Sequence, residues 1–312
     1  MTTYDINKNQ YILEPLIDKA LLDSVTWVTK KCKNSPQEPD YVAALSIKFL
    51  KDLFNILVAV FPEYEFSVLG VYCHQKPIVD IKLNKKPELG DILFVYADRR
   101  EDRRKNREVI LLNSLLLQAK VSKYSWMRVS DSEQHQLELY KNWPEFTYYR
   151  AGYLNGKKRN IFPKSINDGA QYLLIDENPV TNGIYAGREM FPMGCAIPDD
   201  TLYINNSLSR ELVNMLKFKS GRTFDKELYK TDDGWSKMIW DLLKIVNSKY
   251  SKRRNAGMES FHRKNECVHY YTENMGNRTL LDGIEGNEGV ISYEEGVSVV
   301  LVESRLKTQW HD

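Results

Sequence analysis

The sequence predicts a mixed α/β (α+β) protein in which helices flank a mixed sheet, and three observations lead to this fold class. Residues 10–32 and 40–60 carry apolar side chains at helical spacing. Short apolar runs bounded by polar residues follow them, as expected for buried strands. These runs occupy residues 67–72, 78–83, 88–96, 115–122 and 169–175. A further helix at 130–140 gives the expected core order α-β-β-β-α-β.

Each helix has its own start and stop signals. Pro15 suits the first turn of the helix at 10–32, and Asp40 is a good N-cap for the helix at 40–60. Pro62 ends that second helix, because proline disfavours helical backbone in the residue before it. The helix at 130–140 opens with serine and acidic residues, which suit a helix N-terminus.

Two of the strands are expected to form a hairpin. The charged run from Asp98 to Arg107 separates strand 88–96 from strand 115–122 and suits the loop of an antiparallel pair. We expect residues 1–180 to form the core with its N-terminal helices. Residues 181–312 are expected to form a C-terminal α/β elaboration packed on that core, and its segment 181–200, rich in glycine, proline and asparagine, is predicted to be irregular.

Composition is that of an ordinary globular protein, with a formal net charge of +2 and four scattered cysteines. No stretch approaches the roughly 20 apolar residues of a membrane span, and the N-terminus does not resemble a signal peptide. The cysteine spacing fits neither a zinc site nor a disulfide framework, so a cytoplasmic location is expected. No nucleotide-binding motif is present, which predicts that the chain does not use ATP.

The end of strand 115–122 carries the residues with the most informative chemistry. Residues two apart on a strand share a face, so Gln118 and Lys120 project together while Ala119 faces the other way. The predicted hairpin brings Asp91 beside them. The Asp91 carboxylate, the Gln118 side-chain oxygen and the Ala119 backbone carbonyl are ligands that Mg²⁺ or Mn²⁺ accepts. Lys120 is placed to orient a water molecule or to stabilise developing negative charge.

This pattern resembles the PD-(D/E)xK nuclease superfamily, which has the restriction-endonuclease-like fold. Asp91 takes the place of the first acid, and Gln118-Ala119-Lys120 takes the place of the (D/E)xK triplet. Mrr-type restriction enzymes and some phage-defence nucleases are similar in using Q-x-K. Gly90 stands where the family has proline, and the resemblance covers about a third of the chain, roughly residues 65–175. It implies a metal-dependent endonuclease.

The helix at 130–140 extends the resemblance. Gln136 and Tyr140 are four residues apart and share one helical face. RecB-type members of the superfamily are similar in carrying Q-x-x-x-Y on the helix after the lysine strand, where it lines the active site. The resemblance therefore implies that both residues belong to the site. The alternative is that Gln136 is merely exposed and Tyr140 merely packs in the core.

Several alternatives stay open at this level. Asp80 rivals Asp91 as the metal ligand, and Glu88 is a candidate second carboxylate. The basic side chains of the hairpin loop either grip phosphates or form a solvated tip. The aromatic run at 143–149 either stacks on bases or fills the core.

The expected function is metal-dependent cleavage of DNA, in bacterial defence against phage by analogy with the family. DNA is the expected partner, together with a sensor or translocase protein and a second copy of the chain in a homo-oligomer; no membrane contact is expected. The alternative is a non-catalytic nucleic-acid-binding or assembly protein that keeps the fold. An RNA substrate is a third option.

Overall fold

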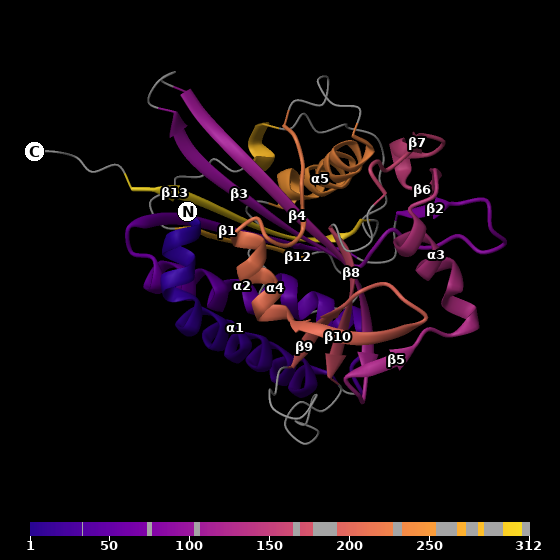
Figure 1. Cartoon of the computed structure of the whole chain (residues 1–312), viewed down its shortest axis with the longest axis horizontal. Helices are drawn as coiled ribbons and strands as arrows, with labels where there is room; N and C mark the ends of the chain where they lie inside the picture. The colour runs from indigo at the N-terminus through magenta and orange to yellow at the C-terminus, as the bar shows by residue number, and fades with distance from the viewer. Residues whose placement is uncertain are drawn as a thin grey trace, which may run out of the picture.

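Ten strands in the described part of the chain form one mixed sheet with helices on both faces, which confirms the predicted fold class (Figure 1). The computed structural model describes residues 1–32, 34–73, 77–102, 107–164, 169–176, 192–226, 233–253, 267–272, 280–283 and 296–307. The helices are α1 (Thr3–Lys31), α2 (Glu38–Val60), α3 (Gln134–Asn142), α4 (Leu208–Leu216) and α5 (Gly234–Arg253), with short 3₁₀ turns η1 (Asp131–Glu133), η2 (Gly152–Leu154) and η4 (Leu280–Gly283).

The strands are β1 (Tyr64–Tyr72), β2 (Ile78–Asp80), β3 (Ile92–Asp102), β4 (Arg107–Ser122), β5 (Trp126–Arg128), β6 (Phe146–Arg150), β7 (Lys158–Arg159), β8 (Ala170–Asp176), β9 (Met193–Ala196), β10 (Thr201–Ser207), β11 (Arg222–Thr223), β12 (Cys267–Thr272) and β13 (Ser298–Leu306). The large sheet has the order β12-β1-β13-β3-β4-β8-β9-β10-β5, and β11 pairs with β4. A small sheet of β2, β6 and β7 lies apart from it.

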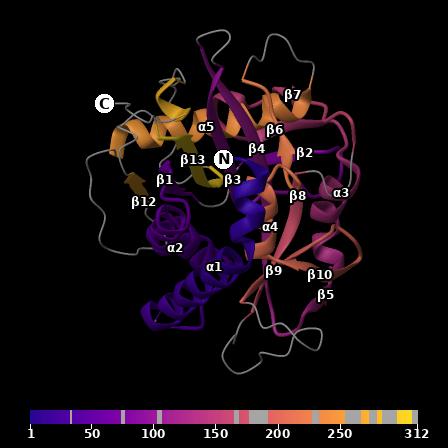
Figure 2. The same cartoon turned by 60° about the vertical axis from the view of Figure 1, so that its left-hand side comes forward.

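Two apolar layers enclose the sheet. Helices α1, α2 and α4 cover one face, whereas α5, α3 and the small sheet lie on the other (Figures 1 and 2). Successive side chains of β4 point alternately into the two layers. Leu115 and Leu117 belong to the apolar cluster under α1 and α2, and Leu116 belongs to the cluster on the opposite face. Because side chains alternate along a strand, an apolar run this continuous requires cover on both faces.

The helices differ from the sequence predictions mainly at their ends. Helix α1 begins at Thr3, because Thr2 and Asp5 form a reciprocal capping box. Pro15 therefore lies inside the helix and not in its first turn, which corrects the prediction for that residue. In the stretch expected to be irregular, Met193–Ala196 is a buried strand; residues 181–191 lie outside the described residues.

The C-terminal strand β13 lies inside the sheet. It pairs parallel with β3 and antiparallel with β1, so it separates the two strands of the large sheet that come first in the chain. Its valine-rich sequence is buried on both faces, as a central strand requires. The predicted boundary near residue 180 thus does not divide the sheet, since β9, β10, β12 and β13 all belong to it.

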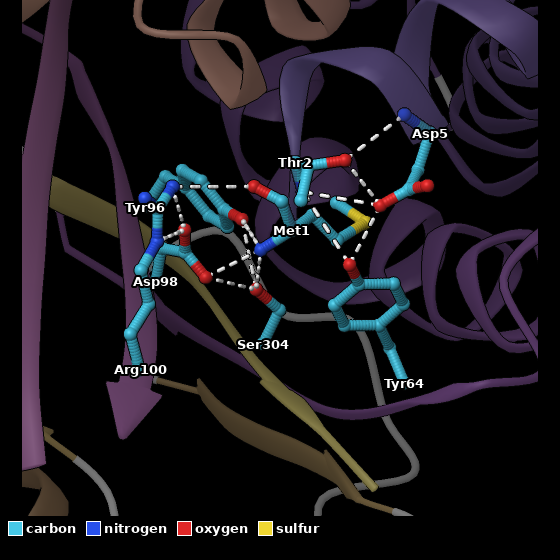
Figure 3. A network of polar contacts seen from close by, with 8 residues as sticks. All are labelled: Met1, Thr2, Asp5, Tyr64, Tyr96, Asp98, Arg100 and Ser304. Atoms are coloured by element: carbon cyan, nitrogen blue, oxygen red, sulfur yellow. Dashed lines mark hydrogen bonds and ion pairs between the residues drawn. The ribbon is translucent and has the colours of Figure 1, made fainter. Parts of the chain in front are cut away.

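A buried ion pair ties the start of α1 to the sheet (Figure 3). The amino group of Met1 contacts the Asp98 carboxylate, and it also donates to Tyr96 Oη over 3.3 Å and to Ser304 Oγ over 3.4 Å. Burial lowers the pKa of this amino group, and the charge of Asp98 opposes the shift. Both members of the pair are almost fully buried, so neither has water as an alternative partner.

Among the described residues, no helix has both the length and the apolar character needed to cross a membrane.

We predict that Asp98→Asn destabilises the fold by about 3–5 kcal/mol, because it leaves a buried ammonium group without its counter-charge. Chemical denaturation monitored by circular dichroism measures this change. Asp23→Asn is the matched control: Asp23 pairs with Lys19 on the exposed face of α1, and its loss should cost less than about 1 kcal/mol. Equal effects of the two variants would contradict the prediction.

Candidate active site

The predicted hairpin forms and assembles the first part of the site. Strands β3 and β4 pair antiparallel, with Ile92 opposite Leu117. This register puts Asp91 beside Gln118, whose Nε2 donates a hydrogen bond to Asp91 Oδ2. The backbone N–H of Ala119 donates to the same oxygen over 2.8 Å. The structure therefore brings together Asp91, Gln118 and Ala119, as predicted, with the Ala119 N–H as the observed contact.

Lys120 projects on the same face of β4 as Gln118 and is held by two acids. Its Nζ lies 2.6 Å from Glu133 Oε1 and 3.7 Å from Glu38 Oε2, and its side chain is 14% exposed. Desolvation lowers the pKa of Lys120, but Glu38 and Glu133 more than compensate, so the net shift is upward. Lys120 is therefore a cation at neutral pH.

Sequence reasoning missed Glu38 and Glu133. Glu133 is an acid just before α3, and Glu38 is an acid in the first turn of α2. In the sequence each has a sufficient local explanation, since acids are favoured at helix N-termini. The only signal for a wider role was that the acids before α3 come soon after the Gln-Ala-Lys strand. Their meeting at Lys120 depends on tertiary packing that local patterns do not contain.

The acids of this cluster raise one another's proton affinity. Desolvation, together with the nearby charge of Glu88, raises the pKa of Asp91 to about 8. Desolvation also raises the pKa of Glu88 and of Glu38, while Lys120 opposes both shifts. In contrast, hydrogen bonds from Lys120 and Ser130 outweigh desolvation at Glu133 and lower its pKa. The site thus has more carboxylates than its one lysine neutralises.

The two α3 residues of the predicted motif both face inward, but they differ in their contacts. Tyr140 is fully buried, and its hydroxyl donates to the Leu89 carbonyl over 3.0 Å. Its ring packs on Trp143 and Tyr172. Gln136 is also buried, which excludes the alternative that it is merely exposed. Tyr140 therefore supports the backbone that leads into Asp91, and it touches the core as well as the site.

Two buried polar atoms of the cluster have no hydrogen-bond partner among the described residues: Gln118 Oε1 and Gln136 Nε2. A buried acceptor or donor left unpaired costs roughly 1–3 kcal/mol, so such atoms mark a place where water, an ion or a ligand binds. One atom is an acceptor beside the Asp91 carboxylate, and the other is a donor on α3. The acceptor is suited to a bound cation, and the donor is suited to a negatively charged group of a ligand.

The structure also places the alternative site residues that the sequence suggested: Asp80, Glu88 and the basic residues of the hairpin. Asp80 forms a salt bridge of 2.9 Å with Lys86 in the small sheet. Glu88 lies near enough to Asp91 to raise its pKa, so it stays a candidate second carboxylate. In the hairpin, Arg99 pairs with Glu303 and Glu108, and Arg100 pairs with Asp98. Residues 103–106, which include other basic residues of the predicted loop, lie outside the described residues.

Within the described ranges, no group of three or more histidine, cysteine, aspartate and glutamate side chains is placed to hold a metal ion. The ligand set predicted from the sequence is of another kind, because one carboxylate, one amide oxygen and one backbone carbonyl make it up. Comparison of the chain with protein-family models, with curated protein sequences and with solved structures finds no match. Any functional assignment consequently depends on the geometry of the site.

The pKa of Asp91 predicts a pH dependence of stability. Between about pH 4 and pH 8 the folded protein keeps a proton on Asp91 that the unfolded chain releases, so stability should fall as pH rises through this window. Asp91→Asn cannot ionise and should flatten this part of the profile. Mn²⁺ should raise the melting temperature of the wild type at pH 8, because it favours the ionised carboxylate, and should leave Asp91→Asn unchanged.

Thermal melting from pH 5 to pH 8.5, with and without Mn²⁺, measures both effects. The matched control is Asp80→Asn, since Asp80 lies near the surface and pairs with Lys86. It should keep the wild-type slope and the wild-type response to Mn²⁺. A metal response that survives in Asp91→Asn would count against a metal site at this carboxylate.

Proposed function

We propose that the chain is a metal-dependent nuclease that hydrolyses phosphodiester bonds in DNA, with its active site at Asp91, Gln118 and Lys120. The observation that carries the proposal is their meeting at one end of the β3–β4 hairpin. A carboxylate is in contact with an amide whose oxygen has no partner among the described residues, and a charged lysine lies two residues further along the same face of β4. Phosphodiester hydrolysis uses this combination, because a cation neutralises the phosphate while a lysine stabilises developing charge.

The chain topology supports the proposal. When the short strands β2, β5, β6 and β7 are left aside, α2, β1, β3, β4, α3 and β8 follow one another in the α-β-β-β-α-β order of the restriction-endonuclease-like core. The pairings β3–β4 (antiparallel) and β4–β8 (parallel, across α3) are those that an intervening hairpin and an intervening helix favour. Two features depart from that core: β13 lies between β1 and β3, and β2, β6 and β7 form a separate small sheet. The proposed role in phage defence is an analogy of fold and motif alone.

The donor set fits a divalent cation such as Mg²⁺ or Mn²⁺. Gln118 Oε1 is buried beside Asp91 and has no hydrogen-bond partner among the described residues. Rotation of the side-chain amide would exchange the positions of its oxygen and its nitrogen. Burial raises the pKa of Asp91 and of Glu88, so both carboxyl groups favour their protonated form, and a bound cation would favour the ionised form of both. Asp91, Gln118 and the Ala119 carbonyl, with Glu88 as a fourth oxygen donor, would hold the ion. When bound, it would polarise the scissile phosphate and acidify a water molecule.

The protein groups have separate tasks in this proposal. Lys120 stabilises the charge that develops on the phosphate, and Glu133 and Glu38 keep it protonated and in position. Gln136 offers its unpaired Nε2 to a phosphate oxygen. Tyr140 is a positioning residue, because its hydroxyl binds the carbonyl of Leu89, two residues before Asp91.

A second candidate function is a non-catalytic nucleic-acid-binding or assembly protein of the same fold. Gln118 favours it, because a neutral amide binds Mg²⁺ more weakly than the carboxylate usual at that position. The tight contact between Lys120 and Glu133 also favours it, since a lysine held in an ion pair is less available to substrate. RNA as substrate is compatible with the same site. Partner proteins and a homo-oligomer stay predictions.

Incubation of supercoiled plasmid with the purified protein and Mn²⁺ or Mg²⁺ tests the function, and Lys120→Ala tests the site. We expect nicking that excess chelator abolishes, with Mn²⁺ at least as effective as Mg²⁺. Lys120→Ala should lose on the order of 10²-fold or more in rate, as for removal of a preorganised electrostatic group. It should stay folded, because Glu38 and Glu133 are both about a third exposed and water can solvate them.

Lys141→Ala is the matched control, because Lys141 lies on α3 and pairs at the surface with Asp199. It should cleave like the wild type. Normal cleavage by Lys120→Ala would remove the proposed site, whereas the absence of any metal-dependent nicking by the wild type, on DNA and RNA alike, would favour the non-catalytic alternative.

Substitutions of Gln136 and Tyr140 on α3 should differ in their effects on cleavage and on stability. Gln136→Ala should reduce cleavage at nearly unchanged stability, because it removes a donor that has no hydrogen-bond partner among the described residues. Tyr140→Phe should lower the free energy of unfolding by about 0.5–1.5 kcal/mol through loss of its hydrogen bond to Leu89, and reduce cleavage as a consequence. Cleavage rates and denaturation curves measured together check this; a strongly destabilised Gln136→Ala would contradict it.

A further inference from the structure

Tyr172 on β8 has a buried hydroxyl group that forms no hydrogen bond with a described residue. Its side chain is only 1% exposed, so bulk water does not reach the group. Tyr140 and Tyr148 are equally buried, and each donates its hydroxyl to an oxygen atom of the protein. Because an unpaired buried hydroxyl destabilises the folded state, that of Tyr172 calls for a partner that the core does not supply.

The register of the sheet places Tyr172 at the candidate site. Strands β4 and β8 are parallel neighbours, and Tyr172 lies opposite Gln118 in their pairing. Opposed residues of paired strands project from the same face of a sheet, so the two side chains are neighbours. Gln118 Oε1 is itself buried and without a partner among the described residues. Two adjacent residues of the sheet therefore each carry an unsatisfied polar group.

Helix α3 brings a third such group to the same junction. The rings of Tyr140 and Tyr172 pack with centroids 5.6 Å apart, and Gln136 lies one helical turn before Tyr140 on the buried face of α3. Its Nε2 is the buried donor that lacks a partner in the described part of the chain. Trp143, from the aromatic run at 143–149, also packs on Tyr140, so this part of the run fills the core and is not a surface for bases.

The hydroxyl of Tyr172 is a hydrogen-bond donor at neutral pH. Burial raises the pKa of Tyr172, and the negative charge of Glu133 raises it further, so the phenol keeps its proton. Glu133 is the acid that holds Lys120 at 2.6 Å, which puts the hydroxyl within electrostatic range of that ion pair. Two donors, from Tyr172 and Gln136, thus accompany the acceptor of Gln118. Donors suit an electron-rich oxygen atom, and the acceptor suits a cation.

We propose that Tyr172 is a further functional residue of the site, whose hydroxyl donates a hydrogen bond to an oxygen atom bound to the cation. The proposal rests on the proposed nuclease function and assigns a new residue to it. The oxygen belongs to a water molecule or to the substrate phosphate, since both present the same lone pairs to a donor. Asp91 and Gln118 hold the ion itself, whereas Tyr172, beside Gln136, holds what the ion carries.

Binding of Mn²⁺ to Tyr172→Phe tests this role without any cleavage step. Isothermal titration calorimetry with the full chain at pH 8 measures the dissociation constant, once with Mn²⁺ alone and once with thymidine monophosphate present as a phosphate probe. We expect Tyr172→Phe to weaken Mn²⁺ binding by about 10-fold, the usual effect of losing a hydrogen bond to a metal ligand. A loss with Mn²⁺ alone identifies the oxygen as that of water, and a loss only with the probe identifies it as that of phosphate.

The same variant should keep its stability. In EDTA, the urea midpoint of Tyr172→Phe should equal or exceed that of the wild type, because the substitution removes a buried polar atom that no described residue pairs with. Tyr148→Phe is the matched control, since Tyr148 is as deeply buried in the same apolar cluster and its hydroxyl donates to Asp241 over 3.2 Å. It should lower the midpoint and bind Mn²⁺ like the wild type.

Three results would overturn the proposal. Unchanged Mn²⁺ affinity of Tyr172→Phe in both titrations would remove the role of the hydroxyl. A midpoint in EDTA as low as that of Tyr148→Phe would show that the hydroxyl has a partner within the fold. Absence of Mn²⁺ binding by the wild type would remove the cation. The nuclease function fails separately: a chain that binds Mn²⁺ with the help of Tyr172 but does not nick plasmid keeps this role and loses the catalytic one.

Discussion

The pairing of β3 with β4 is the constraint on which the candidate site depends. Ile92 lies opposite Leu117, and this register alone decides that Asp91 meets Gln118 and the Ala119 N–H. A slip by one residue would turn every side chain of β4 to the other face of the sheet. Lys120 would then point into the apolar layer under α1 and α2, where Ala119 now lies. The cost of burying the Lys120 charge in that apolar layer opposes the slip.

The same register leaves the charges of the site unbalanced. Glu38, Glu88, Asp91 and Glu133 surround Lys120, so one cation faces four carboxyl groups. Burial and the nearby charge of Glu88 raise the pKa of Asp91 to about 8. The Gln118 amide gives Asp91 a hydrogen bond but no positive charge. A cluster selected only for stability would hold fewer acids, since unpaired buried charge is costly. This excess of carboxyl groups is what the proposed cation would compensate.

The sequence predicted the parts of this arrangement that local patterns encode. Hydrophobic periodicity located α1 and α2, an apolar run located β4, and the charged run between two apolar segments located the hairpin that brings Asp91 to Gln118. It did not predict Glu38 and Glu133 beside Lys120, because each acid has a complete local explanation at a helix N-terminus. Nor did it locate β13 between β1 and β3, since the pairing of strands distant in sequence leaves no periodic signal in either one.

The position of β13 changes how Asp91 is held. The Ser298 N–H donates to the Asp91 carbonyl over 3.1 Å, and Ser298 Oγ donates to the Cys73 carbonyl over 2.8 Å. On the other side, the Asp91 N–H donates to the Leu117 carbonyl over 3.0 Å. The backbone of Asp91 is thus fixed between a strand of the N-terminal half and the last strand of the chain. A C-terminal segment that was expected to pack on the core thus completes the backbone frame of a candidate site residue, so both halves of the chain contribute to the position of Asp91.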